Sequence, residues 1–287
     1  MTAALFVYGS LAPGEPNEPI LSKVGGTWAK GSVRGFLYKR GWGSNIGHNG
    51  IVIDQRGKKV PGFVFTSAKL DEQWKRLDAF EGKEYQRVLV EVEMADGTRK
   101  NAFIYELAMP KFYLETDRLI LRQWREADKP LMREMQTDPE WMVNFPFVRT
   151  PEESDRQVGK LAKEIDQLGF GFFALEDKAT GEFVGFTGLH VPDWKAEFTP
   201  CVEIGWGLRK AWWGSGLVSE AAKGCLEFAS DALDIKEVLS FTTPGNKKSI
   251  AVMERIGMTR VKGGDFMHPK IDPKSPFALH LLYRIKF

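Results

Sequence analysis

The spacing of hydrophobic positions changes along the chain and separates two parts. Residues 1–107 carry short apolar runs or alternating stretches that end in Gly, Pro or Asp-Gly turns, namely ALFVY, VRGFLY, PGFVFT, RVLVEVEM and NAFIYEL. Such stretches predict β-strands. Only residues 69–81 place apolar side chains at every third or fourth position, which predicts one helix. We therefore expect a closed or nearly closed small sheet with few helices.

After a short break at AMPK, residues 108–111, predicted strands and helices alternate. The strands are RLILRQW, GFFALED, EFVGFTGLHV, CVEIGWGL, EVLSFTT and ALHLLYRIK, and the helices are READKPLMREMQ, PEESDRQVGKLAKEIDQL, GLVSEAAKGCLEFASDAL and KKSIAVMERIG. This alternation favours a mixed α/β sheet. A chain of 287 residues exceeds one average domain. We therefore expect two different folds, over residues 1–109 and 112–287.

Composition limits the partners of both parts. Residues 1–110 carry 15 Lys and Arg against 12 Asp and Glu, and the remainder carries 25 against 26. Neither part has the one-signed charge of a polyanion binder, which argues against nucleic acid. No stretch approaches the roughly 18 apolar residues of a membrane span, and the N-terminus has no signal-peptide pattern. We expect a cytoplasmic protein with no membrane partner.

The two cysteines, Cys201 and Cys225, can form at most one bridge, so they make no disulfide framework. No His or Asp is placed to activate either thiol. Both are predicted to be core or space-limited residues.

Glu81 ends an apolar helix face. Leu70, Trp74, Leu77 and Glu81 follow one another at spacings of four, three and four, which places them on one side of a helix. One interpretation is that Glu81 reaches solvent at the helix end or pairs with a nearby cation. The other is a general base, because burial raises the pKa of a carboxyl toward neutrality.

A Gly-Ser turn follows the first predicted strand. In VYGSL, residues 7–11, the strand stops at Gly9 and leaves the amide groups of the turn unpaired by the sheet. Several amide groups pointing the same way bind an anion such as a carboxylate. Alone, the segment could equally be an ordinary turn.

Together, YGSL, GTW…VRGFLY, LDAFEG…YQR and AFIY resemble the γ-glutamylcyclotransferase superfamily over residues 4–107. The resemblance implies a small mixed β-barrel-like fold and an activity of lyase or acyltransferase type. A γ-glutamyl amide is cyclised to 5-oxoproline, and a free amine is released. It assigns proton transfer to Glu81 and needs neither metal nor cofactor. The residues implied in substrate binding are Tyr8, Gly9, Ser10 and Leu11, whose amides would hold the α-carboxylate, with Tyr85 and Tyr105.

A second glycine turn stands before a helix in RKAWWGSGLVSEAA. Gly214 and Gly216 let the backbone curl, and the first amide groups of the helix have no partner within it. Such a turn can bind phosphate, aided by the helix dipole. A lone G-x-G more often only redirects the chain.

The surroundings of this turn resemble the GNAT N-acetyltransferases, of the Rim type. ETDRLILRQW, VEIGWGL, NKKS and IAVMERIGM carry the resemblance over residues 112–287. It implies a mixed α/β sheet, so the expected fold class is α/β and α+β in two domains. The cofactor would be acetyl-CoA, with a strand from Glu203 to Leu208 along its pantetheine arm. The residues implied in cofactor binding are Leu208, Gly214, Ser215, Gly216, Leu217, Val218 and Asn246.

One position departs from the family pattern, because Ala211 stands where relatives often carry Arg or Gln. We expect Arg209 or Lys210 to supply the missing charge. Glu203 is the first candidate for the base that takes a proton from the acceptor amine, and His190 is the second. Ser249 is the candidate that protonates the leaving thiolate.

These features predict a bifunctional enzyme that cleaves a γ-glutamyl amide and acetylates an amine. The alternative is that only one domain is catalytic and the other binds or senses a ligand. The sequence does not distinguish a protein N-terminus, an antibiotic or a metabolite as acetyl acceptor.

Overall fold

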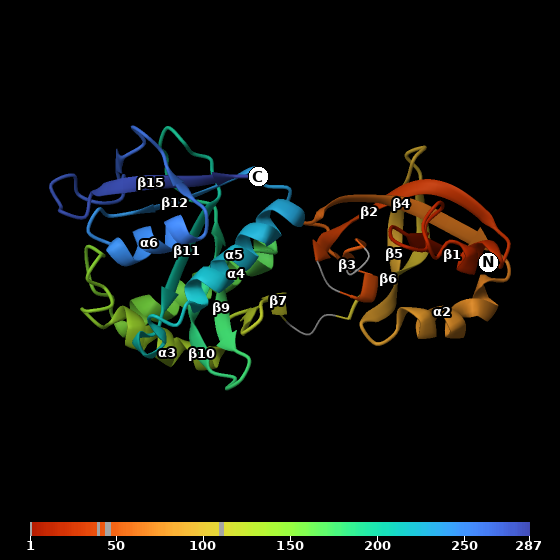
Figure 1. Cartoon of the computed structure of the whole chain (residues 1–287), viewed down its shortest axis with the longest axis horizontal. Helices are drawn as coiled ribbons and strands as arrows, with labels where there is room; N and C mark the ends of the chain where they lie inside the picture. The colour runs from red at the N-terminus through yellow and green to blue at the C-terminus, as the bar shows by residue number, and fades with distance from the viewer. Residues whose placement is uncertain (1, 39–40, 44–46, 109–111) are drawn as a thin grey trace. The chain divides into compact units, whose positions relative to one another are not determined.

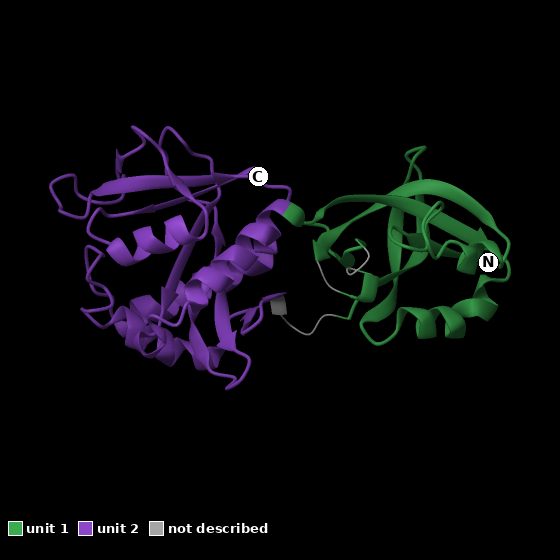
Figure 2. Cartoon of the chain, in the orientation of Figure 1, with its two compact units in different colours: residues 1–110, 231–233 green, residues 111–230, 234–287 purple. Residues whose placement is uncertain are grey.

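The computed structural model describes residues 2–38, 41–43, 47–108 and 112–287. Most of the predicted AMPK break, residues 109–111, lies outside these ranges. The chain divides into two compact units, residues 1–110 with 231–233 and residues 111–230 with 234–287 (Figure 2).

The first unit is built on a closed sheet. Its strands are β1 (Ala3–Val7), β2 (Thr27–Tyr38), β3 (Gly50–Ile53), β4 (Lys58–Ser67), β5 (Tyr85–Met94) and β6 (Arg99–Leu107). They lie in the order β3-β2-β4-β1-β6-β5, and β2 also pairs with β5, which closes the barrel (Figure 1). Only β1 and β6 run parallel among these pairs. The expected closed sheet is confirmed.

Helical segments cover one side of this sheet. They are α1 (Pro19–Ser22), η2 (Leu70–Gln73) and α2 (Trp74–Glu81). Leu70 and Leu77 are buried in one cluster with Leu5 and Phe65, as the predicted apolar face requires. Glu81 is the last residue of α2, before a glycine whose positive φ ends the helix.

Two elements of the first unit were not predicted. Helix α1 has four residues, too few to show a helical period. Strand β3 also has four, and it follows a Gly- and Asn-containing segment that indicates a turn. The predicted helix over residues 69–81 is confirmed, although its first turn is a 3₁₀ helix.

The second unit is a mixed sheet with helices. Its strands are β7 (Phe112–Glu115), β8 (Leu119–Arg122), β9 (Phe172–Asp177), β10 (Phe183–His190), β11 (Glu203–Leu208), β12 (Glu237–Thr242), β13 (Thr259–Arg260), β14 (Phe266–Met267) and β15 (Leu279–Lys286). Its helices are η3 (Glu126–Asp128), α3 (Lys129–Gln136), α4 (Pro151–Leu168), η4 (Lys210–Trp212), α5 (Leu217–Asp231) and α6 (Lys247–Arg255). The predicted strands and helices of this part are all present.

Strand pairing is interrupted in the middle of this sheet. The order is β13-β15-β12-β11-β10-β9-β8-β7. Strands β10 and β11 pair over six residues each, but β11 and β12 are in register only at Glu203 and Leu239. Beyond that pair the two parallel strands diverge, which leaves the edge of β11 toward Leu208 unpaired on this side.

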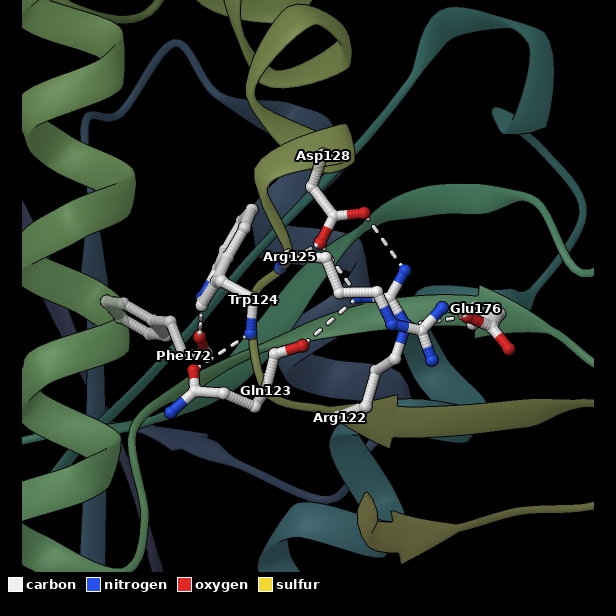
Figure 3. Close-up of polar contacts among 7 residues, drawn as sticks. All are labelled: Arg122, Gln123, Trp124, Arg125, Asp128, Phe172 and Glu176. Atoms are coloured by element: carbon white, nitrogen blue, oxygen red, sulfur yellow. Dashed lines mark hydrogen bonds and ion pairs between the residues drawn. The ribbon is translucent and has the colours of Figure 1, made fainter. Parts of the chain in front are cut away.

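A buried ion network fastens η3 to the sheet. The Arg122 guanidinium donates to both carboxylate oxygens of Asp128, at 2.7 and 2.9 Å, and to Glu176 at 2.6 Å (Figure 3). Arg122 and Asp128 are each only 3% exposed at the side chain. Next to them, the Trp124 indole donates to the Phe172 carbonyl at 2.7 Å. The network therefore fixes the start of β9, where Phe172 lies.

No helix in the described ranges is long and apolar enough to cross a bilayer.

Candidate active sites

A pocket in the first unit gathers the residues predicted for the first site. Its lining includes Tyr8, Gly9, Ser10, Leu11, Glu81, Tyr85 and Tyr105, which are all seven predicted residues. They come from the end of β1, the end of α2, and strands β5 and β6. The barrel therefore brings together side chains that are up to 97 positions apart.

Glu81 is half-buried in this pocket. Burial raises the pKa of its carboxyl to about 7, and the Trp42 indole partly offsets the rise. The Trp42 Nε1–H is itself buried and forms no hydrogen bond of full geometry with any described residue. The pocket thus holds a carboxyl that can exchange a proton near neutral pH beside an unsatisfied donor.

The turn after β1 offers backbone donors to the same pocket. It is held by the Ala12 amide donating to the Gly9 carbonyl and by the Asn17 amide donating to the Ser10 carbonyl, both at 2.9 Å. Within the described ranges, the amides of Gly9, Ser10 and Leu11 have no acceptor. Three free amide groups in one turn suit a carboxylate.

Two tyrosines of the pocket are already engaged. The Tyr8 hydroxyl accepts from the Ile51 amide at 2.9 Å and lies 3.5 Å from the Tyr105 carbonyl. The Tyr105 hydroxyl donates to Asp78 at 2.6 Å. Burial raises the pKa of both hydroxyls, so they stay protonated. Tyr105 therefore presents only oxygen lone pairs to a ligand, which suits an ammonium group.

Tyr105 is held in place by a chain of polar contacts. Asp78 receives two hydrogen bonds from Arg87, at 2.9 and 3.2 Å. The Arg87 guanidinium lies 4.2 Å from the centre of the Trp74 ring. Tyr85, the remaining tyrosine, has its pKa raised to about 12 by burial and by the charge of Glu81.

The sequence did not predict the other residues of the pocket. Phe6 and Val7 come from β1, and the segment between β2 and β3 supplies Trp42, Gly43, His48 and Asn49. This segment has no period of its own.

In the second unit, the divergence of β11 and β12 leaves an open strand edge. At its end, the Leu208 carbonyl accepts from two indoles, Trp141 at 2.8 Å and Trp213 at 3.0 Å. Both tryptophans were missed, and they fix the end of β11 before the glycine turn.

The glycine turn has the conformation that the sequence predicted. Gly214 and Gly216 have φ of +77° and +79°, and an added Cβ at Gly214 would meet no described atom within 4 Å. The Gly214 and Gly216 amides have no acceptor in the described chain, while the Leu217 amide lies 3.4 Å from Ser215 Oγ. Val218 stands in the first turn of α5, where amide groups lack helical partners. This open cradle fits a pyrophosphate.

The cations near the turn are each paired with a carboxylate. Arg209 contacts Glu134 at 3.3 Å, and Lys210 is paired with Asp138 and Glu140, so their contribution to phosphate binding stays a prediction. Arg118, which was not predicted, donates to the Ser215 carbonyl at 3.1 Å and pairs with Glu220 at 2.6 Å. Arg118 comes from the chain just before β8, so only the folded sheet shows that it is near.

Glu203 and His190 face each other across paired strands. Burial raises the pKa of Glu203 to about 7, the charge of His190 lowers it, and the charge of Glu164 raises it. The Glu203 side chain is half-buried.

Asn246 and Ser249 lie together at the start of α6. The Asn246 side chain caps this helix by accepting from the Ser249 amide at 3.2 Å, and it donates to Thr242 at 3.0 Å. Ser249 is half-exposed. In the described chain no contact joins its hydroxyl to Glu203, so its role stays a prediction.

The cysteines are free. Cys225 is buried in α5 and Cys201 is half-buried before β11, and burial raises the pKa of both thiols, that of Cys201 to about 11. Neither thiol is activated. Among the described residues, no group of three His, Cys, Asp or Glu side chains could hold a metal ion.

Two families match successive parts of the chain, and their ranges overlap at residues 118–126. The family described as gamma-glutamyl cyclotransferase, AIG2-like, matches residues 5–126. The acetyltransferase (GNAT) domain matches residues 118–259.

Individual relatives resemble about half of the chain. The Bacillus subtilis protein YkkB is 32% identical over 149 residues, covering 52% of this chain and 86% of YkkB. The FsC-acetyl coenzyme A-N(2)-transacetylase of Aspergillus fumigatus is 30% identical over 154 residues, 52% of this chain and 66% of that protein. The ribosomal protein uS5-alanine N-acetyltransferase of Escherichia coli is 24% identical over 164 residues, 55% and 84%.

Solved structures resemble the chain over a similar share. A GNAT-family acetyltransferase from Bacillus anthracis is 25% identical with a TM-score of 0.51, and the match covers 60% of this chain and 97% of that one. An acetyltransferase from Agrobacterium tumefaciens is 26% identical with a TM-score of 0.50, covering 63% and 96%.

Proposed function

Because this chain belongs to the GNAT acetyltransferases and carries before that domain a γ-glutamyl cyclotransferase domain of the AIG2-like family, we propose that it is a bifunctional enzyme. The first domain cyclises a γ-glutamyl amide to 5-oxoproline and releases an amine. The second transfers an acetyl group from acetyl-CoA to an amine. The observation that supports the first activity most strongly is the half-buried Glu81 facing a turn of free amides.

In the first reaction, the amides of Ser10 and Leu11 hold the α-carboxylate of the substrate. Glu81 takes a proton from the α-ammonium, and the neutral nitrogen then attacks the γ-carbonyl carbon. A carbon–nitrogen bond closes the five-membered ring, and the bond to the leaving amine breaks as Glu81 returns the first proton to it. The second proton of the ring nitrogen passes to the released amine, which leaves as an ammonium ion. Ring closure is intramolecular, so much of the proximity is already present in the substrate.

Two groups of the pocket suit the charges that this reaction develops. The free Trp42 Nε1–H can donate to oxygen, either of Glu81 or of the γ-carbonyl. The Tyr105 oxygen can accept from the α-ammonium, because its own proton is committed to Asp78. Asp78 and Arg87 act as positioning residues for Tyr105.

In the second domain, the residues present fit acetyl-CoA. The amides of Gly214, Gly216 and Val218 would hold the pyrophosphate, and the open edge of β11 up to Leu208 would follow the pantetheine arm. When bound, the cofactor supplies an activated acetyl thioester. Glu203 removes the proton that keeps the acceptor amine unreactive, and Ser249 is the proposed donor to the leaving sulfur.

The relatives do not decide which class of amine is the acceptor, since their names point to different amines. The fusion itself suggests one acceptor. We propose that the amine released by the first domain is acetylated by the second.

Mass spectrometry of the full chain with a panel of γ-glutamyl amides tests the proposal. We expect 5-oxoproline from at least one amide and, once acetyl-CoA is added, an acetylated amine. Glu81→Gln should abolish 5-oxoproline release without changing the fold. If the variant turned over like the parent, Glu81 would not be the base. If no amide were cleaved while acetyl transfer occurred, the first domain would be a binding module.

A further inference from the structure

The acetyltransferase site contains a carboxylate that no motif predicted. Glu164 lies on α4, and its Oε1 is 2.6 Å from Nδ1 of His190. Both side chains are largely shielded, with 17% of Glu164 and 29% of His190 exposed. The contact joins a helix to strand β10 across 26 positions of sequence.

The imidazole ring is fixed from a second side. The Phe172 ring stacks on it at 5.5 Å with 24° between the planes. Phe172 in turn is held at its carbonyl by the Trp124 indole (Figure 3). His190 therefore has one orientation, in which Nδ1 is committed to Glu164.

His190 then meets Glu203 across the strands. The two residues are directly paired in the β10–β11 register, and their charges interact. The side chains from α4, β10 and β11 thus form a row of carboxylate, imidazole and carboxylate. We propose that Glu164 is a positioning residue of the acetyltransferase site, which holds His190 as an imidazolium beside Glu203 and so keeps the Glu203 carboxylate ionised.

The charges around the row agree with this arrangement. Burial alone would lower the pKa of His190, but the hydrogen bond and charge of Glu164 outweigh it and raise the pKa. An imidazolium cannot accept a proton, so the acceptor amine is left with Glu203 as its base. The remaining groups near the row are Asp193, which is paired with Lys270, and the Cys201 thiol, which stays neutral.

Removing the Glu164 charge has two opposite effects on Glu203. Its own charge raises the pKa of Glu203, and that effect disappears. The charge of His190 lowers the pKa of Glu203 more strongly, and it is lost when the imidazole no longer keeps its proton. The net result is a higher pKa for Glu203, so more alkaline conditions are needed to ionise the base.

This inference rests on the proposed acetyltransferase activity, but part of its test does not need turnover. The full chain has only four histidines, so proton NMR can follow the His190 ring, identified by its loss in His190→Gln. We expect the His190 titration midpoint to lie above the ordinary value of about 6.5 in the parent and to fall in Glu164→Gln. Glu164→Asp, which keeps the charge, should retain part of the elevation. An unchanged midpoint in Glu164→Gln would overturn the proposal.

Activity supplies the second part of the test. Acetyl transfer from acetyl-CoA to a probe peptide with a free N-terminal alanine is measured from about pH 5.5 to about pH 9. An essential base makes the rate fall on the acid side of its pKa, and this falling part of the pH profile is the acid limb. In Glu164→Gln that limb should move to higher pH, and each unit of displacement lowers the rate below the midpoint about tenfold. Glu227→Gln, which removes an exposed carboxylate from α5, should leave the limb in place.

The outcomes separate the two claims. In the double variant Glu164→Gln/His190→Gln the limb should lie where it lies in His190→Gln alone, because Glu164 acts through the imidazole. A limb that stays unmoved in an active Glu164→Gln variant would overturn the positioning role. A parent without acetyl transfer to any amine would count against the proposed function, and the NMR midpoint would then decide the role of Glu164.

Discussion

The burial of Glu81 favours its neutral form, whereas its proposed role as a base requires the ionised form. Its place on the apolar face of α2 raises its pKa to about 7, while catalysis needs the ionised form. We expect the rate of 5-oxoproline release to rise with pH through about 7 and then to level off. Initial rates on a cleavable γ-glutamyl amide would show this, and a limb near the ordinary pKa of about 4.3 would contradict the burial of Glu81.

The same carboxyl should make folding depend on pH. Its folded pKa lies above its unfolded value, so the contribution to stability is present below the unfolded value and is lost as pH rises through about 7. Glu81→Gln should therefore unfold at a higher temperature than the parent at alkaline pH and show little difference at acidic pH. Thermal unfolding at both pH values measures this, and equal differences would contradict the linkage.

Trp42 can be tested by removing one hydrogen-bond donor. In Trp42→Phe the ring can keep its edge contact with Phe80, at 5.0 Å between centroids, but the Nε1–H is lost. Because the indole lowers the pKa of Glu81, the acid limb of 5-oxoproline release should move to higher pH. Loss of a donor to developing charge should also slow turnover about a hundredfold or more. An unshifted limb with normal turnover would show that the indole only packs.

The sequence predicted those site residues whose position in the fold and whose chemical role both follow from one short segment. Glu81 follows from spacing on one helix, and the turn after β1 follows from VYGSL. Arg118 and Glu164 could not be found in this way, since each acts on a group that another element brings close, Glu220 being 102 positions from Arg118. Contacts of this kind arise from strand order and register, which one sequence does not encode locally.

At the scale of elements, hydrophobic period predicted nearly all of the fold. Long, strongly periodic stretches such as Pro151–Leu168 match their helices, and α4 adds a capping box at Thr150 and Glu153 and a left-handed glycine at its end. Several elements of two to four residues were not predicted, because a period needs more than one repeat to be visible. They are α1, β3, β7, β13, β14 and η4.

The glycine turn makes a prediction about cofactor affinity. A branched side chain at Gly216 would strain the positive φ and tilt the amides away from the phosphates. Charge-assisted hydrogen bonds contribute about 1.5 to 3 kcal/mol each, so losing two in Gly216→Val should weaken acetyl-CoA binding roughly a hundredfold or more. Calorimetric titration of the full chain measures this affinity.

Two control variants isolate that effect. Gly181→Val imposes similar strain, at φ of +71°, in the β9–β10 turn and should bind acetyl-CoA normally. Ala211→Arg restores the family's usual charge at an exposed position and should change binding by about 1 kcal/mol or less. A strong gain from Ala211→Arg combined with normal binding by Gly216→Val would mean that side chains hold the cofactor.

The ion network of β8 and η3 makes a prediction about stability. Arg122→Leu would leave the buried Asp128 carboxylate without its partner, which typically costs about 3 to 5 kcal/mol. Arg125→Leu removes another guanidinium that pairs with Glu176. Because Arg125 is 57% exposed, this change should lower the free energy of unfolding by about 1 kcal/mol or less. Urea unfolding followed by tryptophan fluorescence reports on this unit, where six of the nine tryptophans lie. Equal losses in both variants would contradict the role of burial.

At the scale of the whole molecule, each proposed site is complete within one unit. Among the described residues, the first draws on β1 and the turn after it, α2, β5, β6 and the segment before β3, and the second on residues after 111. Glu81→Gln should therefore leave acetyl-CoA binding unchanged, and Gly216→Val should leave 5-oxoproline release unchanged. Measuring both properties in both variants tests this, and a loss of both in one variant would show that the activities depend on each other.

The single residue pair that joins β11 to β12 has a consequence for the sheet as a whole. Only Glu203 and Leu239 are in register, so the sheet has two parts, β7 to β11 and β12 to β15, that are joined by few backbone hydrogen bonds. A molecule lying along the open edge of β11 would take the place of a missing strand. Since a ligand that binds only the folded state stabilises it by mass action, the cofactor would also serve as a structural part of the second unit. The free energy of unfolding of the second unit would then increase with the concentration of acetyl-CoA.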